Sequence, residues 1–131
     1  MATWGEVEKI VANLPEQDES TSYGHRAWKV RGKTFVWERP LGKSDQAAVR
    51  ALGEEPYGGD ILAVRVADEG AKQAVLGDTS LPCFTIPHFD GYPAVLVRLA
   101  EATHDQLVEL ITEAWLDRAP ATLREQWPDH P

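Results

Sequence analysis

The stretch HRAWKVRGKTFVWERPLGK, residues 25–43, decides the fold, because its two halves predict the two strands of a hairpin. Apolar and polar residues alternate on both sides of Gly32, as they do in strands with one buried face. Gly32-Lys33 is suited to a two-residue turn of type II′, in which glycine comes first. This turn places Trp28 opposite Trp37. The apolar residues that then share one face are Trp28, Val30, Phe35 and Trp37.

A second turn is available one residue earlier. A turn at Arg31-Gly32 would change the pairs across the hairpin. It would place Trp37 opposite Arg26 and would separate apolar from polar residues less cleanly. Because a change of register by one residue moves the apolar set to the other face, the pattern favours the first turn.

The same stretch is basic, although the chain as a whole is acidic. The chain has 21 acidic and 13 basic side chains and a formal net charge of -8 at pH 7. Within residues 25–43, the only acid is Glu38. A cationic hairpin on an anionic body is a place where an anionic partner can dock. The candidates for contact with DNA phosphates are Arg26, Lys29, Arg31, Lys33, Arg39 and Lys43.

Other roles also fit these residues. The cations can pair with acids elsewhere in this acidic chain, and they can protect an exposed strand from aggregation. Trp28 and Trp37 can stack on nucleic-acid bases if their rings are exposed. Their apolar neighbours in the hairpin favour a place in the core instead.

Helical spacing of apolar residues and capping residues such as Thr3 and Thr103 predict helices on both sides of the hairpin. The predicted helices cover residues 4–14, a segment from a cap at Ser44 or Asp45 to residue 52, residues 68–76, a segment from residue 103, and a short piece after Pro120 that docks through Leu123 and Trp127. The buried stripe of the helix after Thr103 is predicted to be Leu107, Leu110, Ile111, Ala114 and Trp115.

The predicted strands outside the hairpin are a short segment near Ser22–Tyr23 and residues 61–66, 81–86 and 94–99, with a polar loop at 16–22. Helices and strands in this order predict an α+β fold, with a mainly antiparallel sheet packed against N-terminal and C-terminal helices. A length of 131 residues predicts one domain, residues 1–131.

Composition indicates a protein of the cytoplasm. Hydrophobic residues make up 43% and charged residues 26% of the chain, as in ordinary globular proteins. The single cysteine, Cys83, excludes an internal disulfide and fits a reducing compartment. No apolar run approaches the ~20 residues that span a bilayer, and no secretion signal precedes the first predicted helix. We therefore expect no membrane partner.

A loop flanked by proline and glycine, residues 87–93, is the second candidate site. Its polar side chains His88, Asp90 and Tyr92 can contact a protein or a small ligand. Asp90-Gly91 is also a good turn dipeptide, which explains the composition without any ligand. Metal-ligand spacings, catalytic motifs and phosphate-binding loops are absent from the sequence, so we expect no metal, no cofactor and no enzymatic activity.

Four pieces of the chain, in order, resemble the MmcQ/YjbR family. They are the first predicted helix ending in Leu14-Pro15, the pair Tyr23-Gly24 followed by RAWKVRGKTFVW, the segment TIPHFDGYPAVLVRL from Thr85 to Leu99, and the closing segment from Leu107 through EAWLDRAP to Leu123. The third piece is the most specific.

The resemblance implies a small α+β protein whose fold is similar to a double-wing DNA-binding motif. It therefore implies a DNA-binding protein that contacts phosphates through the basic hairpin. It supplies no catalytic residues. The alternative function is a protein- or small-ligand-binding module that uses the loop from His88 to Tyr92.

Overall fold

A single antiparallel sheet of six strands organises the computed structural model, which describes residues 2–125. The strand order is β1-β2-β3-β4-β6-β5, and every neighbouring pair is antiparallel. The strands are β1 (Gln17–Ser22), β2 (His25–Val30), β3 (Lys33–Glu38), β4 (Ile61–Arg65), β5 (Cys83–Phe84) and β6 (Ala94–Arg98). The helices are α1 (Trp4–Ala12), α2 (Lys43–Ala51), α3 (Glu69–Gly77), α4 (His104–Arg118) and α5 (Ala121–Arg124), with 3-10 turns η1 (Pro87–Phe89) and η2 (Leu99–Glu101). The predicted α+β fold with a mainly antiparallel sheet is confirmed.

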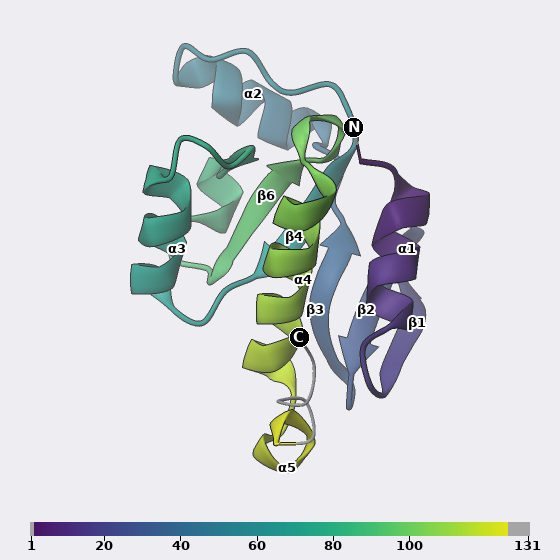
Figure 1. Ribbon diagram of the computed structural model, residues 1–131. Helices are drawn as coiled ribbons and strands as arrows, with labels where there is room; N and C mark the ends of the chain where they lie inside the picture. The colour runs from purple at the N-terminus through teal and green to yellow at the C-terminus, as the bar shows by residue number, and fades with distance from the viewer. Residues whose placement is uncertain (1, 126–131) are drawn as a thin grey trace.

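Helices α1 and α4 lie side by side on one face of the sheet, which we call the first face (Figure 1). The predicted stripe of α4 is confirmed, because all five of its residues are buried. The Trp115 indole donates to the Pro15 carbonyl oxygen at 3.0 Å and ties α4 to the end of the α1 segment. Thr3 and Thr103 cap α1 and α4 with their hydroxyl oxygens, as predicted.

The opposite side, which we call the second face, has a smaller core. Its buried residues come from β4, β6, α2 and the segment 86–89, and none comes from β1 or β2. Trp37 on β3 packs against this cluster while remaining half-exposed. The second face of the hairpin is therefore where the molecule presents an open surface.

The hairpin turns at Arg31-Gly32, so the prediction of a Gly32-Lys33 turn was wrong. Both turn residues have positive φ, +50° and +81°, as a type I′ turn requires. A bulge then shifts the register, so that Lys29 pairs with Thr34 but Trp28 pairs with Val36. The bulged strand β3 has one residue more than its partner at this point.

This bulge places the two tryptophans of the hairpin in different cores. Trp28 is 2% exposed in the core under α1 and α4, whereas Trp37 packs on the second face. The prediction that Trp28 and Trp37 share one face was therefore wrong. Phe35, the extra residue, is fully buried together with Val36.

Other boundaries differ from the predictions in ways that follow from strand pairing. The predicted loop at 16–22 is strand β1, which pairs with β2 along its whole length despite its polar sequence. The predicted strand 81–86 contains only the two residues of β5, at the edge of the sheet.

Trp127, which was predicted to help dock the last short helix, lies outside the described residues. Within residues 2–125, no helix combines the length and the apolar character needed to cross a membrane.

Candidate binding cleft

A cleft of about 670 Å³ opens on the second face, next to the hairpin. Its walls come from the turn between β1 and β2 and the start of β2, from β3, from the chain that enters α2, and from the loop around η1. The side chains that matter for its chemistry are His25, Trp37, Arg39, Asp45, His88 and Tyr92. The two candidate sites of the sequence, the basic hairpin and the loop 87–93, thus meet at one cavity.

Aromatic rings form one wall of the cleft. The Trp37 and Tyr92 ring centroids lie 6.5 Å apart in an edge-on arrangement, and Phe89 lies 6.4 Å from Trp37 and 5.6 Å from Tyr92. Phe89 is buried beneath, whereas Tyr92 is 41% exposed. The exposed ring edges can contact a flat ligand.

An ion pair lies beside these rings, because the Arg39 guanidinium carbon is 5.5 Å from the centre of the Phe89 ring. Arg39 Nη1 lies 3.0 Å from Asp45 Oδ2, and the backbone N–H of Gly42 donates to the same oxygen at 3.1 Å. Burial alone would raise the pKa of Asp45. The hydrogen bonds from Arg39 and Gly42, with the electrostatic effect of Arg39 and His88, outweigh burial and lower that pKa. Asp45 was predicted as a possible cap; it is the third residue of α2 and bonds the N-cap backbone.

A buried lysine from α3 fixes the loop that carries His88 and Tyr92. Lys72 is 2% exposed, and its Nζ donates to the carbonyl oxygens of Phe89 at 2.6 Å and Tyr92 at 2.8 Å. Sequence reasoning missed Lys72. The sequence did hold a signal for its burial. Lys72 precedes Val75 by three residues and Leu76 by four, and this spacing places it on the apolar face of the helix.

The six cations of the hairpin segment do not all have the same surroundings. Three arginines are in ion pairs: Arg26 with Glu8 and Glu38, Arg31 with Glu16, and Arg39 with Asp45. Arg26 also lies over the Trp4 and Trp28 rings. Lys29, Lys33 and Lys43 have no ion pair with any residue in the range 2–125.

These cations are also spread over the hairpin. Arg26 and Arg39 line the cleft, whereas Arg31 and Lys33 lie at the turn between β2 and β3. Lys43 is the first residue of α2. They therefore do not gather at one point of the surface.

The three residues of the loop candidate are also separated. His88 and Tyr92 line the cleft, and Asp90 is exposed and outside its walls. Across the described part of the chain, no three histidine, cysteine or acidic side chains are grouped as metal ligands would be.

The YjbR family model matches residues 12–116 of this sequence. The chain belongs to the YjbR family. The match runs from the end of α1 to near the end of α4, so it includes every strand and the whole cleft.

Two curated relatives of this chain come from mycobacteria. The chain is similar to the uncharacterized protein Rv2570 of Mycobacterium tuberculosis and to the uncharacterized protein Mb2600 of Mycobacterium bovis. Each is 54% identical over 123 residues, which cover 94% of this chain and 93% of the relative. No solved structure matches the chain.

Proposed function

We propose that this YjbR protein is a binding protein that holds a small, flat aromatic ligand in the cleft on the second face. The observation that carries the proposal is the convergence of half-exposed aromatic rings and polar side chains at one concave site. Ligand sites are typically clefts of about this size, lined by apolar groups with a few convergent polar groups.

The charges of the wall indicate the polarity of the ligand. Arg39 is paired with Asp45, and Arg26 is paired with Glu38, so each cation of the cleft has an acid beside it. The imidazoles of His25 and His88 add groups that can donate or accept hydrogen bonds. Such a wall suits a ligand that has both donors and acceptors better than a simple anion. A heteroaromatic ring that carries an amide group is an example.

A fragment comparison tests this proposal. Heteroaromatic amides, the matching carboxylates and the matching amines are titrated against the isotope-labelled protein, and the Trp37 indole resonance is followed. We expect the amides to shift Trp37 saturably, and His88→Ala to abolish that shift. Lys33→Glu, at the distant hairpin turn, is the matched control and should leave it intact. A panel that leaves Trp37 unmoved, or equal binding by the His88 variant, would refute the proposal.

DNA binding is the second candidate function, and it is supported by the unpaired lysines Lys29, Lys33 and Lys43 and by the family resemblance. Each phosphate contact on duplex DNA adds about −0.9 to the slope of log affinity against log salt. The double variant Lys29→Glu/Lys33→Glu should therefore weaken binding to all sequences and make the slope about 2 units shallower.

This experiment measures duplex binding over a salt series, with polyaspartate as the non-nucleic control polymer. Lys9→Glu, which reverses an exposed lysine on α1, is the matched charge control. Absence of binding at low salt, or equal affinity for polyaspartate, would exclude a specific role for DNA.

We also propose a single domain over residues 1–131 and a place in the cytoplasm, where the free thiol of Cys83 would stay reduced.

A further inference from the structure

Two arginines outside the cleft walls have buried nitrogen atoms without partners. They are Arg65, the last residue of β4, and Arg118, the last residue of α4. The Nε atom of each is buried and has no hydrogen-bond partner in the described chain. The C-terminal ends of β4 and α4 lie at the same end of the sheet (Figure 1). Buried polar groups normally have partners, so two such atoms require an explanation.

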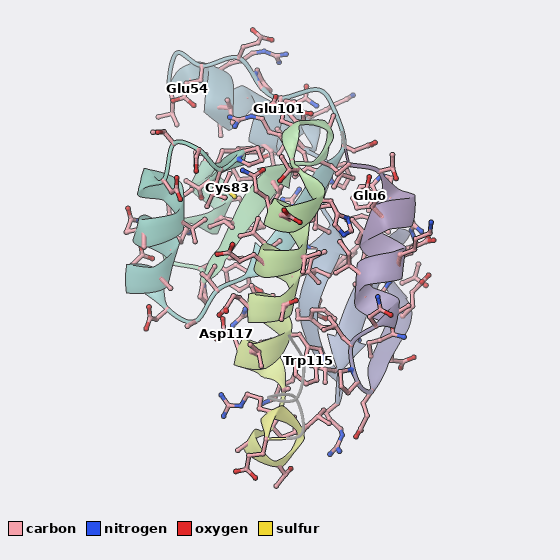
Figure 2. All side chains as sticks on the ribbon, viewed as in Figure 1. Glu6, Glu54, Cys83, Glu101, Trp115 and Asp117 are labelled. Carbon is pink, nitrogen blue, oxygen red and sulfur yellow. The ribbon has the colours of Figure 1, made fainter. Side chains whose placement is uncertain are left out.

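Among residues 2–125, neither guanidinium has a carboxylate in direct ion-pair contact. The described chain contains no ion pair to Arg65 or Arg118, although acids outnumber bases in the sequence. Asp117 is exposed and lies on the side of α4 away from α1 (Figure 2). Its carboxylate attracts both guanidiniums electrostatically but is too far from either for an ion pair. One carboxylate thus lies near two half-buried cations and forms an ion pair with neither.

Tyr92 fixes the position of one of these cations. Arg65 Nη1 donates to the Tyr92 hydroxyl at 3.1 Å, and the Arg65 guanidinium carbon lies 5.1 Å from the centre of the Tyr92 ring. Arg65 is therefore held in place without losing its charge. The remaining N–H groups of its planar fork stay available to an acceptor.

The two guanidiniums are close enough to repel each other. Burial and the positive charge of Arg65 lower the pKa of Arg118, and they outweigh Tyr92 and Asp117, which act in the opposite direction. A bound anion would remove this repulsion. A phosphate carries close to two negative charges and several acceptor oxygens, so it matches two guanidinium forks better than a carboxylate does.

We propose that Arg65 and Arg118 form an oxyanion site that binds a phosphate group, beside Tyr92 and apart from His88. This site goes beyond the proposed function, because it uses other cations and another class of ligand. Tyr92 contributes to both, since it lines the cleft beside Trp37 and its hydroxyl accepts a hydrogen bond from Arg65.

Inorganic phosphate is the probe in the experiment. The arginine Nε–Hε resonances of the full chain are recorded during titration with phosphate, and with chloride or acetate at the same ionic strength. We expect phosphate to shift the signals of Arg65 and Arg118 saturably, and acetate to shift them less. The exposed Arg50 on α2 serves as the internal control and should not respond.

Variants separate a binding role from a structural one. Arg118→Gln and Arg65→Gln should each weaken phosphate binding about tenfold or more, since each removes charge-assisted hydrogen bonds. Without phosphate, Arg118→Gln should melt at the same temperature as the wild type or higher, because the repulsion is gone. Arg50→Gln should keep full affinity.

Three results would overturn the site: no phosphate-dependent shift, an equal shift with acetate, or full affinity in Arg118→Gln. His88→Ala distinguishes this site from the cleft. The His88→Ala variant should still bind phosphate but should no longer bind the aromatic amide. Either proposal can therefore fail while the other stands.

Discussion

Lys72 Nζ lies 2.8 Å from the Tyr92 carbonyl oxygen and 2.6 Å from that of Phe89, at a depth where the lysine is only 2% exposed. One ammonium group from α3 thus satisfies two backbone acceptors of the loop that forms the aromatic wall. A buried charge is tolerated only when it is well hydrogen-bonded. The position of Tyr92, which contacts both proposed sites, depends on this lysine.

Lys72→Met should lower the free energy of unfolding by about 2–3 kcal/mol, because it removes two buried, charge-assisted hydrogen bonds. The two carbonyl groups then keep only their backbone donors, the amides of Tyr92 and Ala94. Urea unfolding measures the loss. Hydrogen exchange should show reduced protection of the Tyr92 amide, which donates to the Phe89 carbonyl in the native loop. Lys9→Met, on the exposed side of α1, is the control and should change stability little. Equal effects of the two substitutions would show that Lys72 does not hold the loop.

Asp45→Asn should destabilise the protein by about 1–3 kcal/mol at pH 7, since it removes the ionic part of the bond to Arg39. The folded pKa of Asp45 lies below its usual range, because the bonds from Arg39 and Gly42 outweigh burial. The stability from this group is therefore present above pH about 4 and is lost as pH falls through the lower folded pKa.

Urea unfolding of the wild type and of Asp45→Asn over a pH series checks this expectation, and the gap between them should close in acid. Asp105→Asn is a matched control, since Asp105 also lies in the first turn of a helix but has no ion pair in the described chain. A gap that persists unchanged at low pH would contradict the assignment.

Cys83 should react slowly with thiol reagents in the folded protein. Burial raises the pKa of its thiol to about 11, although the Arg98 guanidinium acts in the opposite direction. Figure 2 shows Cys83 within the body of the molecule rather than at its rim. At pH 8, the thiolate would be on the order of a hundredfold rarer than in the unfolded chain.

The labelling rate of native and urea-unfolded protein measures this difference without ambiguity, because the sequence has one cysteine. Rates within a few-fold of each other would mean that the thiol is open to solvent.

The helices could be predicted from the sequence because their signals are local. The spacing of Leu107, Ile111 and Trp115 depends only on the 3.6-residue period, and Thr103 marks the start of the same helix. Strand β1 gave no such signal, since its sequence QDESTS is polar throughout and shows no alternation of apolar and polar residues. It is a strand because its backbone pairs with β2, which is a property of the partner rather than of the segment.

The cleft could be predicted only in part. The proline and glycine residues around His88 and Tyr92 indicated a loop that presents side chains, and the loop does line the cleft. Arg39 follows β3, and the loop precedes β6. They meet because β3 and β6 both pair with β4, and no local sequence pattern specifies that pairing. The separation of Trp28 from Trp37 escaped prediction because a bulge adds one residue without changing the composition of the strand.

Gly32→Ala tests the observed turn and register of the hairpin. Gly32 has a φ of +81°, and an added methyl group would meet no atom within 4 Å, so any loss of stability reports backbone strain alone. We expect a loss of about 1 kcal/mol in urea unfolding. Gly58→Ala is the matched control, because its methyl group also enters open space and its φ is not positive. If both substitutions leave stability unchanged, the turn does not hold Gly32 in the left-handed region, and the type I′ assignment is wrong.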